Sequence, residues 1–270
     1  MNIWQAVLLG IIQGITEWFP VSSSGHLVLT KHFLGIEPSL FFDVFVHFGS
    51  ALVVLIIFRK EVKNVIASFF SALKDLPVEG GNAFFKTADR KLSLFIILAS
   101  IPTGLIGLLV SYYYEGFLSD PFWVGAALLL TGIVLISTKG RRGHKSEKEM
   151  TSLDGILVGI MQGIAAVPGI SRSGFTISTA IHRRLDRDLA VRYSFLLFLP
   201  AITAAGLLKA SSLTSSSTEN LIPIFIGTVT AVIVGYVSIK TLLKLIEKGK
   251  FYMFSFYCLA VGTVLVYLSA

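Results

Sequence analysis

The chain has 270 residues, of which 54% are hydrophobic and only 14% are charged, and its net charge is +7. A soluble globular chain carries about 25% charged residues. The composition therefore excludes a cytosolic enzyme, a secreted domain and a disordered chain, and it predicts an all-α integral membrane protein.

Eight apolar segments follow one another along the chain, and two of them are too short to cross a bilayer, which takes about 20 apolar residues. These two, about 4–15 and 155–167, each run into a Gly/Pro/Ser-rich break and then resume. They predict two re-entrant helical hairpins, over 4–30 and 153–182. The other segments predict six transmembrane helices, over about 41–58, 92–113, 121–138, 190–208, 221–243 and 252–269.

The basic residues indicate which connections face the cytoplasm, because cytoplasmic loops carry an excess of lysine and arginine. Placing the basic stretches inside puts both termini outside, with the first hairpin entering from the outer side and the second from the inner side. The same bias accounts for the net charge, so no nucleic-acid partner is expected. Twenty of the 23 lysines and arginines fall in 59–91, 139–148, 183–192 and 240–250.

The two hairpins are related by an internal repeat at an offset of 149 residues. Residues 10–15 (Gly-Ile-Ile-Gln-Gly-Ile) match 159–164, and Ser22–Gly25 matches Ser171–Gly174. Each half holds one hairpin and three spans, and because three is odd the halves have opposite orientations. This predicts an inverted-topology repeat within one structural domain. Its parts are a first repeat over 1–138, a cytoplasmic linker over 139–150 and a second repeat over 151–270.

The hairpin tips carry the chemistry, because ionisable groups at membrane depth are costly and mark function. Glu17 and His26 lie on the first hairpin and Arg172 on the second. Broken helices expose backbone N–H groups, and arginine presents a planar fork suited to phosphate oxygens. The tips therefore predict a phosphate site. Its binding residues are Ser22, Ser24, Gly25, Ser171, Ser173, Gly174 and Thr176.

A cation is expected beside Glu17, because a lone carboxylate would repel a phosphate. Gln13 lies four residues before Glu17, on the same helical face. Oxygen ligands from Gln13, Glu17 and phosphate suit Mg²⁺ or Ca²⁺. The alternative is a purely structural ion pair between Glu17 and Arg172. Asp43 and His47, four residues apart, are expected to bond each other.

The two tips together resemble a known family. Residues 13–26 read Gln-Gly-Ile-Thr-Glu-Trp-Phe-Pro-Val-Ser-Ser-Ser-Gly-His, and 168–176 read Pro-Gly-Ile-Ser-Arg-Ser-Gly-Phe-Thr. These motifs resemble those of the undecaprenyl-diphosphatases, the bacitracin-resistance family of membrane lipid pyrophosphate phosphatases, and the resemblance covers nearly the whole chain. The chain departs from the pattern at Gln13, where some members have Glu, and at Ser24, which replaces Thr.

The resemblance implies an enzyme that removes the terminal phosphate of undecaprenyl diphosphate, recycling the lipid carrier for cell-wall synthesis and conferring bacitracin resistance. It implies a site in the cell membrane that is reached from the outer face. By this resemblance Ser23 is the nucleophile, His26 the base or acid, Glu17 the metal or base residue, and Arg172 the phosphate clamp.

Three alternatives stay open at this point. His26 could attack the phosphorus directly, with Ser23 only binding an oxygen. A polyprenyl-phosphate transporter or flippase is the second functional hypothesis, because inverted repeats with broken midplane helices are transporter architecture. The chain could also act as a homodimer.

Overall fold

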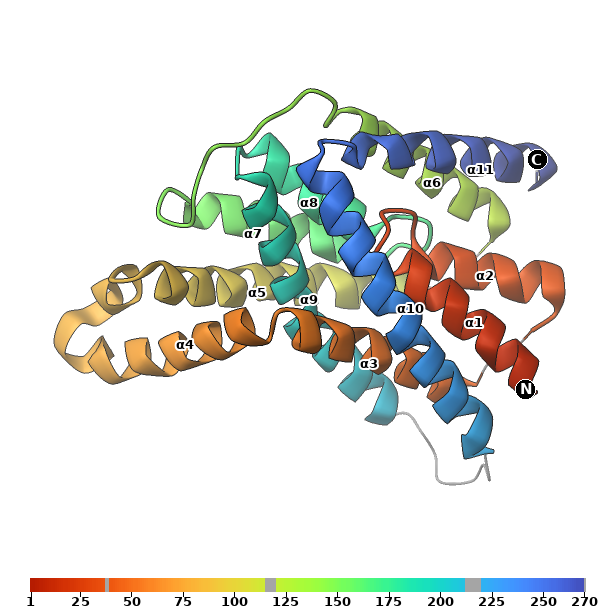
Figure 1. Ribbon diagram of the computed structural model, residues 1–270, viewed down its shortest axis with the longest axis horizontal. Helices are drawn as coiled ribbons and strands as arrows, with labels where there is room; N and C mark the ends of the chain where they lie inside the picture. Colours follow the sequence, from red (N-terminus) through yellow and green to blue (C-terminus); the bar gives the residue numbers. More distant parts are fainter. Residues whose placement is uncertain (37–38, 115–119, 212–219, 270) are drawn as a thin grey trace.

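The computed structural model describes residues 1–36, 39–114, 120–211 and 220–269, and within these ranges the chain is helical and forms no strand. The α-helices are α1 (Ile3–Thr16), α2 (Ser23–Leu34), α3 (Leu40–Ile57), α4 (Arg59–Glu79), α5 (Ala88–Tyr114), α6 (Pro121–Ile136), α7 (Ser152–Ile164), α8 (Arg172–His182), α9 (Arg187–Ser211), α10 (Leu221–Glu247) and α11 (Phe254–Ser269) (Figure 1). Short 3₁₀ turns lie at Gly80–Phe85 and Phe251–Met253.

The all-α membrane class is confirmed. Within the described ranges, α3, α5, α9, α10 and the segment Phe251–Ser269 are long and apolar enough to cross a membrane. A helix occupies each of the six predicted spans, although α6 has only 16 residues and is not among these five candidate spans. Asp120 caps α6 by accepting a hydrogen bond from the Phe122 N–H, and Pro121 occupies its first turn, which fixes where the helix begins.

The basic segment 59–91 contains a helix that the charge pattern did not indicate. The chain bends at Phe58, and α4 then runs back along the first part of α5, so that the two project from the body as an antiparallel pair (Figure 1). Arg90 fastens the pair, because its guanidinium donates to Asp75 at 2.9 Å and to Ser71 at 2.6 Å. The hydrogen bond from Arg90 also lowers the pKa of the Asp75 carboxyl.

Both predicted hairpins are present as pairs of short helices. α1 starts at Ile3 and α7 at Ser152, and each start is fixed by a capping box, at Asn2 and Thr151. The second helix of each hairpin starts at Ser23 or at Arg172. Both pairs of starts are 149 residues apart, which is the offset of the sequence repeat.

Each hairpin packs against a long helix from the other half of the chain: α1 lies on α10, and α7 lies on α5. The backbones come very close. A Cβ on Gly10 would lie 2.5 Å from the Gly227 carbonyl oxygen, and one on Gly159 would lie 2.2 Å from that of Ala99. Only glycine allows such an approach, which is typical of helix pairs in membranes. This exchange between the halves brings the two hairpin tips together.

Candidate active site

The tips of the two hairpins are joined through the hydroxyl of Ser22. Ser22 has a left-handed backbone (φ 69°), which is uncommon for a residue with a side chain. Its Oγ accepts the N–H of Gly25 in its own turn, at 3.3 Å, and that of Gly169 in the other turn, at 3.1 Å. The Ser24 hydroxyl is 3.4 Å from it. The strained turn therefore holds the two tips in register.

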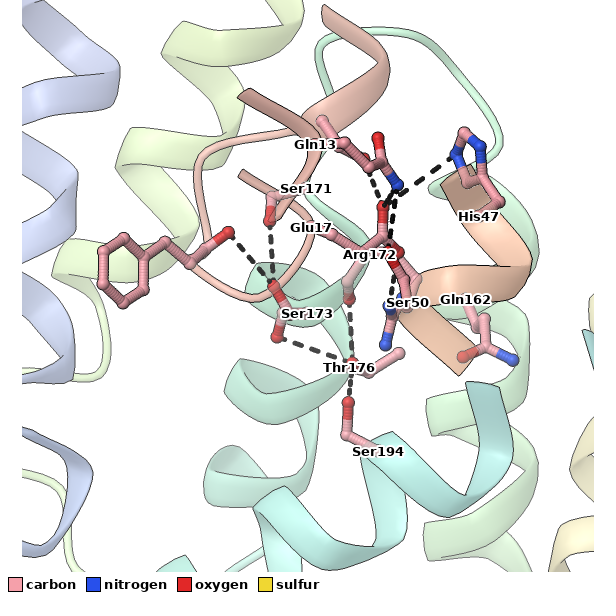
Figure 2. Close-up of polar contacts among 12 residues, drawn as sticks. Gln13, Glu17, His47, Ser50, Gln162, Ser171, Arg172, Ser173, Thr176 and Ser194 are labelled. Carbon is pink, nitrogen blue, oxygen red and sulfur yellow. Dashed lines mark hydrogen bonds and ion pairs between the residues drawn. The ribbon is translucent and has the colours of Figure 1, made fainter. Parts of the chain in front are cut away.

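Glu17 is the centre of the site, as Figure 2 shows. Its Oε1 accepts a hydrogen bond from Arg172 Nη2 at 2.7 Å, and its Oε2 accepts one from Ser23 Oγ at 2.6 Å. Gln13 Nε2, one helical turn earlier, also donates to Oε2 at 3.1 Å. The structure thus brings Gln13, Glu17, Ser23 and Arg172 together around one buried carboxylate.

Arg172 packs against two aromatic rings. The central carbon of its guanidinium lies 4.0 Å from the centre of the Phe198 ring and 5.7 Å from that of Trp18, which favours the cation. Nη2 is used by Glu17, whereas Nη1 is buried and has no hydrogen-bond partner among the described residues. A buried donor without a partner is costly. Nη1 is therefore the group best placed to bind an anionic ligand.

Two further polar side chains, His47 and Ser50, reach the site from α3. Ser50 Oγ accepts a hydrogen bond from Gln13 Nε2 at 3.3 Å, and His47 Nε2 lies 4.0 Å from Glu17 Oε2 (Figure 2). His47 Nδ1 is 2.7 Å from the backbone oxygen of Asp43, so the expected bond between these two residues involves the main chain. Polar residues at 43, 47 and 50 along one face of an apolar span are the signal that could have found them.

His26 does not contact Ser23 in this structure, and no hydrogen bond joins the expected pair. Its Nδ1 lies 2.7 Å from the backbone oxygen of Ser22, and its Nε2 lies 2.7 Å from the hydroxyl of Tyr257 in α11. Because a carbonyl only accepts, Nδ1 carries the proton and Nε2 accepts from Tyr257. The two rings are also stacked, with their centres 5.7 Å apart. His26 therefore faces α11 rather than the nucleophile candidate.

The other predicted phosphate ligands are engaged with the protein. Ser171 Oγ caps α8 by accepting the Gly174 N–H at 3.1 Å. Thr176 donates to the Arg172 carbonyl at 2.8 Å, and its hydroxyl is 2.5 Å from that of Ser194. Ser173 Oγ lies 3.3 Å from Ser171 Oγ. These hydroxyls stabilise the tips, and their role as phosphate ligands stays a prediction.

The expected cation site at Gln13 and Glu17 stays a prediction. Gln13 Oε1 is buried and has no hydrogen-bond partner among the described residues. Gln13 directs its Nε2, and not this oxygen, at Glu17. Amide and carboxylate oxygens are nevertheless the kind of ligand that Mg²⁺ prefers, and Mg²⁺ is often held by one or two carboxylates plus substrate phosphates. Within the described ranges, no group of three His, Cys, Asp or Glu residues could hold a metal ion by itself.

Comparison with known proteins shows which family the chain belongs to. The family described as "Bacitracin resistance protein BacA" matches residues 6–264. The chain belongs to the BacA family. The match includes both hairpin tips and every residue of the site, His47 and Tyr257 among them, and it confirms the family resemblance of the tip motifs.

Individual BacA relatives are similar over their full length. The chain is 42% identical to a protein named undecaprenyl-diphosphatase from Halothermothrix orenii, over 100% of this chain and 99% of the relative. It is also 42% identical to one of the same name from Korarchaeum cryptofilum, over 98% and 99%. A third, from Methanosphaera stadtmanae, is 37% identical over 100% and 99%.

Proposed function

We propose that this protein removes the terminal phosphate from undecaprenyl diphosphate, giving undecaprenyl phosphate and inorganic phosphate. One observation carries the proposal: Ser23 and Arg172, from different hairpins, bind the two oxygens of Glu17 at 2.6 and 2.7 Å. A nucleophile, a base and a phosphate-binding cation are thereby gathered at one buried point. The names of the BacA relatives support the same substrate.

Ser23 is the nucleophile in this proposal, and Glu17 transfers its proton. As the bond from Ser23 Oγ to the terminal phosphorus forms, the bridging phosphorus–oxygen bond breaks, and Glu17 passes the proton to the departing lipid phosphate. In the second step, Glu17 takes a proton from the attacking water and returns it to Ser23 Oγ as inorganic phosphate leaves. The 2.6 Å hydrogen bond favours Glu17 over His26 as the base for Ser23.

Arg172 and the polar groups around Glu17 neutralise the phosphate. Arg172 Nη1 has no hydrogen-bond partner among the described residues, and it would donate a hydrogen bond to a phosphate oxygen. Gln13 Oε1 and Glu17 would hold a divalent cation, Mg²⁺ or Ca²⁺, against the diphosphate. When bound, such a cation supplies charge neutralisation of the phosphate oxygens.

Replacing Arg172 by lysine should lower turnover by roughly 30- to 1,000-fold, which corresponds to one lost contact to the reacting phosphate. Lysine keeps the charge but lacks the planar fork that binds Glu17 and phosphate together. The measurement is phosphate release by purified Arg172→Lys, with a melting temperature close to that of the wild type as the control for folding. Near-normal turnover would show that Arg172 does not bind the reacting phosphate.

An apolar groove on helices that also carry residues of the site suits the polyprenyl chain. It runs between α3, α4 and α9 and includes Phe48 and Ala51, which are the neighbours of His47 and Ser50 in the sequence. Leu199, the neighbour of Phe198, lies on its other side. The groove thus begins on the two helices that bear site residues. We assign it to the isoprenoid tail of the substrate.

In the proposed topology, six helices cross the cell membrane, the two hairpins are re-entrant, and the site is reached from the outer face. The basic stretches support this orientation. The inverted repeat is supported by the 149-residue offset of the hairpin starts and by the packing of each hairpin on the other half.

Cysteine labelling tests the orientation. In a background with Cys258→Ser, an impermeant maleimide should label Ser269→Cys in intact cells but reach Lys148→Cys only after lysis. Both replaced residues are exposed, so accessibility depends on the side of the membrane. Labelling of Lys148→Cys in intact cells would contradict the proposed orientation.

Phosphate release from undecaprenyl diphosphate in detergent micelles tests the proposed activity, because micelles have no compartments between which a lipid could be transported. We expect release of phosphate by the wild type, and loss of that release on chelation with recovery on adding Mg²⁺ or Ca²⁺. Absence of release at any cation concentration would favour the transporter hypothesis. Full activity in excess chelator would support the phosphatase activity but exclude a requirement for a divalent cation.

A further inference from the structure

Seven basic side chains without acidic partners gather where three connections meet. The segments 139–142, 184–187 and 247–250 together carry these seven and only two acidic residues. Within the described ranges none of the seven forms an ion pair with a carboxylate. This basic cluster consists of Lys139, Arg141, Arg142, Arg184, Arg187, Lys248 and Lys250.

Arg187 joins the three segments. Its Nη2 donates to the backbone oxygen of Arg141 at 3.0 Å. On the other side its guanidinium lies against Gly249 in the turn between α10 and α11, where an added Cβ would come within 2.7 Å of Nη1. Arg187 is only partly exposed, whereas the other six cluster residues are exposed. A guanidinium has five N–H donors, so most of them remain for a ligand.

Two acidic residues from neighbouring segments, Asp154 and Glu147, are already paired with other cations. Asp154 accepts hydrogen bonds from Arg183 at 2.7 Å and from Lys145 at 3.0 Å. Arg192 binds Glu147 at 2.6 Å. Within the three segments, Asp186 and Glu247 offset only two of the seven positive charges, so the basic cluster keeps a positive field that attracts anions.

The cluster lies at the ends of membrane helices. Arg187 begins α9, and Lys248 directly follows α10, two of the helices that are long and apolar enough to span a bilayer. The Lys139 ammonium lies 5.4 Å from the centre of the Tyr252 ring, and aromatic rings of this kind are enriched where membranes meet water. Met253, just before α11, and Phe256, in its first turn, are exposed apolar side chains.

We propose that the basic cluster binds the phosphate of an anionic phospholipid headgroup. The guanidinium of Arg187 matches the geometry of phosphate oxygens, and the exposed cations around it supply the attraction that draws anionic lipids to basic segments at a membrane surface. The acyl chains would lie along the apolar start of α11. The site shares no residue with the group around Glu17.

Native mass spectrometry of the detergent-purified chain tests this site, with short-chain phosphatidylglycerol as the probe and phosphatidylcholine as the lipid control. The wild type should bind one phosphatidylglycerol more tightly than phosphatidylcholine. The variant Arg142→Gln/Lys248→Gln/Lys250→Gln should lower the affinity for that phosphatidylglycerol by roughly 10- to 100-fold. None of these three side chains makes a hydrogen bond or ion pair among the described residues, so the variant should fold.

The matched control is Lys60→Gln/Lys63→Gln/Lys74→Gln, which removes the same charge from exposed positions on α4. It should keep the preference for phosphatidylglycerol. Equal loss in both variants would show that only net charge attracts the lipid, and an unchanged preference in the cluster variant would also overturn the proposal. Displacement of the lipid by inorganic phosphate, or tighter retention of a short RNA, would assign the cluster to another ligand and equally overturn it.

Discussion

Ser23→Ala should reduce phosphate release by roughly 10³-fold or more, because it removes the atom that bonds to phosphorus. The matched control is Ser24→Ala at the same tip. The Ser24 hydroxyl lies 3.4 Å from Ser22 and makes no hydrogen bond to Glu17, so this variant should stay within about tenfold of wild-type turnover. A Ser23→Ala enzyme as active as Ser24→Ala would exclude serine attack.

The same experiment identifies the adduct when a single turnover with terminally labelled substrate is quenched in acid. Phosphoserine survives acid, whereas phosphohistidine does not. Label that stays on a peptide containing Ser23 is the expected outcome. Acid-labile label on His26 would instead establish direct attack by the imidazole, and its contact with Tyr257 would then hold the nucleophile.

Glu17→Gln should lower turnover by about 10²- to 10⁴-fold, the range for loss of a general base. The amide cannot take the proton of Ser23. It also leaves the buried Arg172 cation without its partner, which costs roughly 3–5 kcal/mol of stability. Phosphate release and thermal unfolding of the purified variant measure the two effects separately.

The double variant Glu17→Gln/Arg172→Gln distinguishes chemistry from folding. Because it removes both charges of the pair, it should recover much of the stability that Glu17→Gln loses, yet remain inactive. Recovery of activity along with stability would mean that Glu17 and Arg172 both serve only the fold. That outcome would support the structural ion pair considered as the alternative in the sequence analysis.

The sequence was sufficient to predict the helices that are marked by a continuous apolar run. The six apolar runs became helices, and the two Gly/Pro/Ser breaks became hairpin tips with starts at Ser23 and Arg172. The helix over 59–79 was not foreseen, since its basic residues dominated the interpretation of that stretch. Its apolar residues, Ile66 and Phe70 among them, lie on a helical face that a periodicity count would detect.

The contacts of the site were predictable only where a motif contained both partners. Gln13 and Glu17 lie one turn apart and do bond. Tyr257, by contrast, meets His26 across 231 positions, and His47 reaches Glu17 from a different helix. No local pattern encodes such distances, because they depend on how α3 and α11 pack around the tips.

Proton transfer between Ser23 and His26 stays a prediction, and the hydrogen bonds of His26 lie elsewhere for a local reason. The helix does begin at Ser23, so the two residues are three apart on it. The imidazole nevertheless bonds to the carbonyl of Ser22, the residue four positions before it, and this turns the ring toward α11. Competition from a nearby backbone acceptor is a recurrent cause of such differences.

The common offset of the hairpins also bears on the number of covalent phosphates that one chain can bind in the proposed mechanism. The residues 149 positions after Glu17, Ser23 and His26 are Ala166, Arg172 and Phe175. The duplicated half thus places a guanidinium where its counterpart places a hydroxyl, and both side chains bind the same carboxylate. In the proposed mechanism one chain therefore binds a single covalent phosphate, because the two halves together form one composite centre rather than two independent ones.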